Sequence, residues 1–232
     1  KNLNAILFSE EFSPQILKNM REIPTEVKNT AVADCIVKQL GHYIPRILLK
    51  EALRIIITET NSKLDSRAMV YITGAGEVIK PLVSMVVQLG FSKINLVDAD
   101  LDRLMNHAEN LRKKYFGINF LLIQDAELTL QPSNGSLLIN TIGAGSDQLL
   151  QDISYMNFLK RDGLIADLPF SKVDNPVVSE GKDAGIPLVT SLQLQAYKDY
   201  ELLSLLEIPN LPSKRDYVSL WSAFLNQDKG AV

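Results

Sequence analysis

From Ala68 onward the sequence alternates between short apolar runs and segments with helical periodicity, and this alternation limits the fold more than any other feature. The apolar runs are AMVYIT, KINLVD, NFLLIQ, SLLINTI, GLIADL and IPLVT. They do not alternate strictly between polar and apolar residues, which is typical of strands buried on both faces of a parallel sheet. Strands that alternate with helices in this way predict an α/β fold with a doubly wound parallel sheet.

The chain before Ala68 shows helical patterns without the short apolar runs. Residues 1–66 are predicted to form a small helical N-terminal region, with helices over SPQILKNMREI, PTEVKNTAVADCIVKQLGHYI and PRILLKEALRIIITETNS. Pro24 and Pro45 stand where the second and third of these helices would begin. Residues 67–232 would then form the second domain, which ends in two further helices over SLQLQAYKDYELLSLL and KRDYVSLWSAFLNQ.

The first apolar run of the alternating part ends in a glycine-containing turn. A helical segment follows this turn, and the next apolar run ends on an acid. In a dinucleotide-binding unit the first glycine permits a tight turn, the second leaves space for a pyrophosphate, and the acid accepts hydrogen bonds from the ribose. The pattern therefore predicts a Rossmann-like domain. The cofactor contacts that it predicts are Gly74, Ala75, Gly76, Glu77, Val78, Asp98 and Ala99.

Charges at the end of the second run bear on which cofactor would fit. The segment VDADLD contains Asp98, Asp100 and Asp102, and no cation precedes Arg103. A 2′-phosphate would meet carboxylates there, so we expect NAD in preference to NADP.

Two residues of the turn argue against any dinucleotide. Ile79 stands where such turns normally have a third small residue, and Glu77 puts a negative charge beside a phosphate. The turn is therefore also compatible with a tight connection in an α/β fold that binds another ligand or no cofactor at all.

Net charge and hydropathy exclude several classes of partner. The formal charge of −3 gives no reason to expect nucleic acid or an anionic membrane surface. No apolar run approaches the roughly 18 residues of a membrane span. The glycine turn instead predicts a small-molecule ligand as a partner.

Cysteine and histidine are too scarce for several kinds of site. Cys35 is the only cysteine, which excludes an internal disulfide and a cysteine-based zinc site, and it is predicted to be a buried thiol and not a nucleophile. The two histidines, His42 and His107, poorly supply a catalytic triad or a metal site, so no metal is expected. A reducing, cytoplasmic location is the corresponding expectation.

Other polar and aromatic residues have plain structural interpretations. His107 lies in an amphipathic segment and is predicted to be exposed, and Lys50 is predicted to be a solvated helix lysine. Tyr217, Trp221 and Phe224 recur at helical spacing in the last predicted helix, which indicates either core packing or the face of a homodimer.

Three further segments resemble shikimate dehydrogenases. The segments SLLINTIGAG, DLPFSKVDNPVVSEGKDAG and QAYKDYELL are similar to INATPIG, DVVYNPxxTPLLxxAxxxG and QAxxxFELW of that family, in the same order after the glycine turn. The resemblance covers roughly residues 66–210. A weaker likeness links GAGEVIKPLV to the nucleotide-binding domain of glutamyl-tRNA reductases, which lack the Gln-Ala segment.

The resemblance implies roles for individual residues. It implies that the two glycines contact the pyrophosphate, that Asp98 contacts the ribose, and that Asn140, Thr141 and Ile142 lie beside the cofactor. On the substrate side it implies Gln195, and Phe170 in place of a family tyrosine. The family's catalytic Lys and Asp lie in NVTxPxK and NTD segments. HYIPRILLKEAL has a proline and Lys50 in an order faintly similar to the first, which leaves a general acid as the alternative to a solvated Lys50, but no NTD segment follows, and Ala99 stands where the family has an arginine. The catalytic residues therefore stay unassigned.

Two functions of different classes follow. The first is an NAD(P)-dependent oxidoreductase that moves hydride between the nicotinamide and a small hydroxy or keto acid. The second is a catalytically inactive Rossmann-fold protein, a pseudoenzyme that senses a nucleotide or serves as an assembly or regulatory module. The fold alone does not distinguish them, because function belongs to the site.

Overall fold

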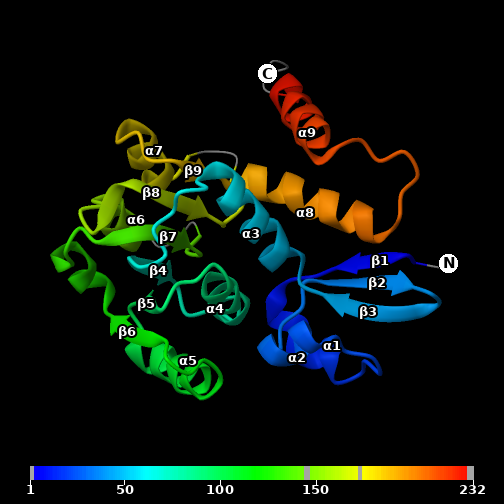
Figure 1. Cartoon of the computed structure of the whole chain (residues 1–232), viewed down its shortest axis with the longest axis horizontal. Helices are drawn as coiled ribbons and strands as arrows, with labels where there is room; N and C mark the ends of the chain where they lie inside the picture. Colours follow the sequence, from blue (N-terminus) through cyan, green and yellow to red (C-terminus); the bar gives the residue numbers. More distant parts are fainter. Residues whose placement is uncertain (1–2, 144–146, 172–173, 229–232) are drawn as a thin grey trace. The chain divides into compact units, whose positions relative to one another are not determined.

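The computed structural model of the chain describes residues 3–143, 147–171 and 174–228 (Figure 1). It divides the chain into two compact units. The terminal unit contains the chain up to Leu53 together with the chain from Leu192, and the central unit runs from Arg54 to Ser191. The sequence instead places the boundary after residue 66 and assigns both C-terminal helices to the second domain.

The central unit is built on a six-stranded parallel sheet in the order β6-β5-β4-β7-β8-β9. Its strands are β4 (Met69–Thr73), β5 (Lys93–Val97), β6 (Asn119–Ile123), β7 (Gly135–Asn140), β8 (Leu159–Asp167) and β9 (Leu188–Val189). The strand order reverses between β4 and β7, which lie side by side, as in doubly wound dinucleotide-binding sheets. The predicted α/β fold is confirmed, and each of the six apolar runs forms a strand.

Helices connect these strands. The central unit contains the end of α3 (Leu48–Thr60), then α4 (Ile79–Gln88), α5 (Leu101–Lys114), the 3₁₀ helix η2 (Asp125–Leu130), α6 (Asp147–Ser154) and α7 (Pro176–Asp183). Helices α4 and α5 contact each other, and α6 contacts both α7 and η2. Because crossovers between parallel strands are right-handed, the two groups cover opposite faces of the sheet.

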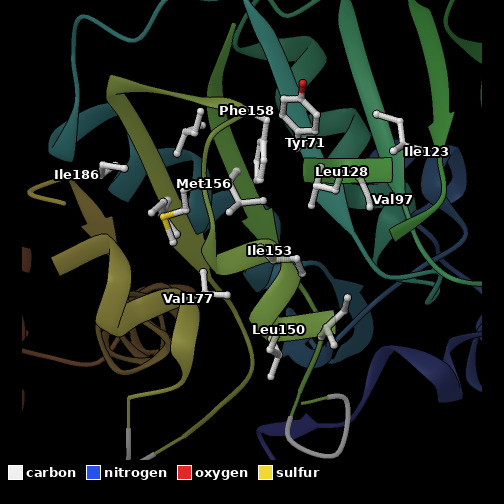
Figure 2. Close-up of a cluster of buried hydrophobic side chains, with 14 residues drawn as sticks. Tyr71, Val97, Ile123, Leu128, Leu150, Ile153, Met156, Phe158, Val177 and Ile186 are labelled. Carbon is white, nitrogen blue, oxygen red and sulfur yellow. The ribbon is translucent and has the colours of Figure 1, made fainter. Parts of the chain in front are cut away.

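A buried apolar cluster fills the space between one face of this sheet and the second group of helices (Figure 2). The ring of Tyr71 in β4 packs against Phe158, with the ring centroids 4.7 Å apart. Ile153 of α6 and Val177 of α7 belong to the same cluster and are fully buried. The neighbours of Tyr71 in β4 point to the opposite face and are equally buried. The sheet is therefore covered on both faces, as the apolar runs predict.

The terminal unit combines a small antiparallel sheet with short and long helices. The sheet has the order β1-β2-β3, with β1 (Ala5–Leu7), β2 (Cys35–Gln39) and β3 (His42–Arg46). The helices are η1 (Glu10–Phe12), α1 (Ser13–Leu17), α2 (Thr25–Thr30), the start of α3, α8 (Ser191–Leu205) and α9 (Lys214–Asp228). Leucines 202, 205 and 206, in and just after α8, pack on Cys35 and Val37 of β2.

The helix predicted over residues 24–44 is wrong beyond Thr30. Strands β2 and β3 form a hairpin there, joined by Leu40 and Gly41, whose φ angles are 49° and 85°. Positive φ at both central residues is the geometry of the tight turns that two-residue hairpins prefer. The run Cys35–Val37 can be interpreted as an apolar helix stripe, but its β-branched residues suit a strand. Because residues 35–46 form this hairpin, the N-terminal region is only partly helical.

Candidate functional site

The glycine turn lies at the reversal point of the central sheet, and the fold itself requires its first glycine. Gly74 has a φ of 97°, and a Cβ added to it would lie 2.3 Å from Oγ1 of Thr141. The Thr141 hydroxyl donates to the carbonyl of Thr73, so it cannot move away without losing that bond. Gly74 is therefore needed for the close approach of the β4 and β7 ends.

The second glycine of the turn has no such requirement. The φ angle of Gly76 is not positive, and an added Cβ would meet only a Val78 methyl carbon, at 3.8 Å. Gly76 is half-buried. No contact within the described part of the protein explains a glycine here, whereas the approach of a pyrophosphate to the backbone would.

The helix after the turn presents hydrogen-bond donors. Within the described residues, the N–H groups of Gly76, Glu77 and Val78 donate to no protein acceptor. The first residue of α4, Ile79, is fully buried, and none of its atoms lies within 4 Å of a Cβ added to Gly76. Glu77 pairs with Lys80 at 2.5 Å, which offsets its negative charge. Free N–H groups at a helix N-terminus favour an anion, and a phosphate fits this arrangement.

His107 holds the turn from α5. Its Nε2 lies 3.1 Å from the carbonyl oxygen of Ala75, and because a carbonyl only accepts, this nitrogen carries the proton. The histidine is 9% exposed, so the prediction of an exposed residue is wrong. His107 lies between Leu104 and Leu111 on the buried face of α5, and this spacing was the available signal.

Asp98 directly follows β5 and is half-buried. Its Oδ1 accepts the N–H of Asp100 at 2.9 Å, and Asp100 in turn caps α5 by accepting the N–H of Arg103. Its Oδ2 accepts no hydrogen bond from the described residues. Asp98 is therefore held in place with one oxygen available, as ribose recognition would need. Ala99 beside it is exposed.

Asn140 joins the ends of three strands. Its Oδ1 accepts the Thr73 hydroxyl at 2.7 Å and the N–H of Ile142 at 3.1 Å, and its Nδ2 donates to Asp167 at 2.7 Å. Asp167 also accepts from Asn175, the N-cap of α7. Burial raises the pKa of the Asp167 carboxyl, against the effect of these two amide donors. Asn140 is fully buried, and both ends of its side-chain amide are hydrogen-bonded within the protein. It therefore holds these three strand ends together.

Several residues of the resembling segments have no structural description. Ala144 and Gly145 of the first segment and Lys172 and Val173 of the second lie outside the described residues. Phe170, the implied substrate-side residue, is 63% exposed in the central unit.

Gln195, the other implied substrate-side residue, lines a cavity of about 300 Å³ in the terminal unit. We call this cavity the Asp34–Lys198 pocket. Its lining residues are Leu7, Phe8, Asp34, Leu48, Gln195, Lys198 and Asp199.

Asp34 is the most buried charged group of this pocket, with 2% of its surface exposed. Its Oδ1 accepts the N–H of Leu48 at 2.7 Å and its Oδ2 that of Leu49 at 2.8 Å, so it caps α3. Nζ of Lys198 lies 3.5 Å from the same Oδ2. The sequence predictions missed both charged residues. Lys198 follows Gln195 at helical spacing and could have been found on that ground, but nothing near Asp34 in the sequence indicates its partner.

Two further predictions have clear outcomes. Lys50 is only 6% exposed, so the prediction of a solvated lysine is wrong. Cys35 is buried as predicted, although in a strand. Burial and the nearby Asp34 charge raise the pKa of its thiol to about 12.

Across the described ranges, no group of three or more His, Cys, Asp or Glu could hold a metal ion. No helix within those ranges is long and apolar enough to cross a membrane.

Comparisons with known proteins find similarity in the fold but none in the sequence. No protein-family model matches the sequence, and a search of curated protein sequences found no match. Solved structures do match. Quinate dehydrogenase from Corynebacterium glutamicum in complex with NAD has a TM-score of 0.78 at 12% identity, over 96% of this chain and 78% of that one.

Two shikimate dehydrogenases give similar values. The enzyme from Thermus thermophilus, solved with NADP(H) and shikimate, has a TM-score of 0.72 at 12% identity, over 96% of this chain and 80% of that one. A second shikimate dehydrogenase, solved with NADP⁺, has a TM-score of 0.74 at 13% identity, over 95% and 76% of the two chains. The chain has a shikimate dehydrogenase-like fold.

The shikimate dehydrogenase-like fold confirms the resemblance that the three sequence segments indicate. At 12–13% identity, this structural similarity concerns the course of the backbone and not the residues of the site. The remaining fifth to quarter of each of these dehydrogenases has no counterpart in this chain. Roles for individual side chains must therefore be argued from their own geometry.

Proposed function

We propose that the protein is an NAD(P)-dependent oxidoreductase that transfers hydride between the nicotinamide and a small hydroxy or keto acid. The bound cofactor would supply the hydride chemistry. The residues of the central unit would bind and orient it. The glycine turn and the N-terminus of α4 would hold the pyrophosphate, and Asp98 would hold the ribose.

Gly76 is the observation that carries this proposal. The fold requires Gly74 but gives no reason for Gly76, whose own N–H group and those of Glu77 and Val78 have no acceptor in the described structure. A ligand that approaches the backbone closely and carries negative charge explains both features. The fold likeness supports the same conclusion, since the similar structures were solved with NAD or NADP.

Titration of the full chain with NAD⁺, NADH, NADP⁺ and NADPH tests the cofactor. We expect at least one of them to bind with a dissociation constant below about 1 mM. A ligand at a hundred times its dissociation constant then raises the unfolding free energy by roughly 2.7 kcal/mol. If none of the four raises the unfolding midpoint at millimolar concentration, the proposal fails.

Asp98 provides the prediction for cofactor preference. Replacing Asp98 with Ala should weaken NAD⁺ binding by about 1–3 kcal/mol, because a charged acceptor for the ribose hydroxyls is lost. NADP⁺ should be affected less, since its 2′-phosphate gains from removal of a carboxylate. Calorimetric titration measures both constants. Glu109→Ala, at an exposed acid further along α5, is the matched control and should change neither. Unchanged NAD⁺ affinity in Asp98→Ala would remove the basis for preferring NAD.

Turnover separates the proposed enzyme from a nucleotide-binding protein without activity. Shikimate and quinate are the first substrates to test, because they or their dehydrogenases occur in the similar structures. The absence from the sequence of the family's NVTxPxK and NTD segments favours the inactive alternative. Reduction of NAD⁺ or NADP⁺ with either acid supports the enzyme, whereas cofactor binding without turnover on hydroxy and keto acids supports the sensor or assembly module.

A further inference from the structure

Another cavity of the terminal unit lies beside the start of α3 and has a volume of about 170 Å³. We call it the Lys50 cavity. Its lining residues are Glu26, Arg46, Ile47, Leu48, Lys50, Glu51, Glu201 and Leu205. An apolar cavity of about 150 Å³ binds benzene. The Lys50 cavity therefore has room for a single compact ligand.

Lys50 is the lining residue that most requires a partner. It is only 6% exposed, and its side chain makes no hydrogen bond or ion pair with any residue that the structure describes. Taking an ammonium group out of water without an acceptor costs free energy, so buried lysines are rarely left unpaired. The N–H donors of Lys50 are therefore available to an oxygen atom of a ligand.

Arg46 adds to the excess of donors at this cavity. Its Nη2 donates to Oε1 of Gln39 at 2.5 Å, whereas its buried Nε has no acceptor within the described part of the chain. Arg46 is the last residue of β3, and Lys50 lies in the first turn of α3, so both cations come from one short stretch. This stretch favours an anionic group, and a carboxylate is a compact one.

The other charged residues of the lining are acids. Glu201 is paired with Lys214 at 2.7 Å, and Glu51 is also engaged. The exposed side chain of Glu26 makes no hydrogen bond or ion pair with the described residues, so it can accept from a ligand ammonium group. Because three acids and two cations line the cavity, a ligand that carries only negative charge does not suit it.

We propose that the Lys50 cavity binds a small α-amino acid, with the ligand carboxylate on Lys50 and the ligand ammonium on Glu26. Ile47, Leu48 and Leu205 contribute apolar lining, which suits a short apolar side chain on the ligand. L-Alanine has this chemistry and a size similar to that of benzene. The inference goes beyond the proposed function, because none of these residues belongs to the glycine turn and no dinucleotide takes part.

Calorimetric titration of the full chain without cofactor tests the class of ligand. L-Alanine carries both charges, propionate keeps the carboxylate, and ethylamine keeps the ammonium. We expect L-alanine to bind with a Kd below about 1 mM, and propionate and ethylamine to bind at least about tenfold more weakly, because each loses one charged contact. L-Tryptophan should not bind, because it is larger than the cavity. The proposal is overturned if L-alanine does not bind at millimolar concentration, or if any of the other three compounds binds as tightly.

Variants of the two charged residues locate the binding. Lys50→Met removes an ammonium group that has no partner among the described residues, so the urea midpoint should stay unchanged or rise. The affinity of this variant for L-alanine should nevertheless fall by at least about tenfold. Glu26→Gln should weaken L-alanine binding by about fivefold and leave propionate binding unchanged.

The control is Lys18→Met, at the exposed C-cap lysine of α1, which should change nothing. Unchanged L-alanine affinity in either Lys50→Met or Glu26→Gln overturns the assignment. Because no cofactor is present in these titrations, failure of dinucleotide binding would leave their results unaffected.

Discussion

Two glycines of one turn have different reasons to be glycine. Gly74 is required by its positive φ and by the hydroxyl of Thr141, both of which belong to the fold. Gly76 has an ordinary φ and open space around it. A sequence pattern cannot separate these cases, because both positions match it equally well. At the residue scale, Gly76 is therefore the part of the motif that indicates a ligand.

The hydrogen bond from His107 to the glycine turn leads to a prediction at the residue scale. Its N–H fixes the Ala75 carbonyl and with it the orientation of the next peptide N–H. We expect His107→Leu to weaken NAD⁺ binding by about tenfold and His107→Gln, which keeps an N–H donor, by about threefold or less. Titration with NAD⁺ measures both, and urea unfolding gives their stabilities. Equal losses of affinity in the two variants would show that the histidine acts only through packing.

The helix N-termini of the structure differ in how they are capped. Asp34 caps α3, Asp100 caps α5 and Asn175 caps α7. The N-cap of α4, Val78, makes no side-chain hydrogen bond, and the same holds for the short helices α1 and α2 of the terminal unit. Orphan N–H groups at a helix end need water, a side chain or a ligand. At the element scale, α4 therefore differs from α5 and α7 of the central unit, and a phosphate would complete its N-terminus.

The cap of α3 can be tested by its effect on stability. Asp34→Ala leaves two backbone N–H groups and Lys198 without their buried acceptor, so we expect a loss of about 2–3 kcal/mol in unfolding free energy. Asp34→Asn keeps one acceptor and should cost about half as much. Urea denaturation measures both. If Asp34→Ala loses less than about 0.5 kcal/mol, the carboxylate does not support α3 in the way described.

Elements with strong periodicity could be predicted, and those that depend on distant partners could not. The six strands could be predicted because burial on both faces makes most of them apolar, although β6 at the edge of the sheet exposes Leu121. The hairpin of β2 and β3 was missed because a run such as Cys35–Val37 fits a helix stripe as well as a strand, and only pairing with β1 decides between them. His107 was misplaced because a single polar residue on an apolar helix face is ambiguous.

The same limit applies to the sites. The glycine turn and Asp98 lie within one continuous stretch, so their relation was visible in the sequence. Asp34 and Lys198 come from opposite ends of the chain, and only folding of the terminal unit brings them together. Gln195 was found through resemblance, without any sign of the charges around it.

At the scale of the whole molecule, the proposed dinucleotide site belongs to the central unit, at its glycine turn. A homodimer through the aromatic stripe of α9 stays a prediction, although Phe224 of that stripe is 65% exposed.

The most direct measurement of the central claim is NAD⁺ binding by the full chain and by its Gly76→Ala variant, alongside their unfolding free energies. An alanine fits the empty space at this position, so stability should be unchanged or rise by about 0.4–1 kcal/mol. The methyl group would occupy the path of the pyrophosphate, so the affinity for NAD⁺ should fall by at least about tenfold. Equal affinity in the two proteins, or no binding by either, would contradict a dinucleotide site at this turn.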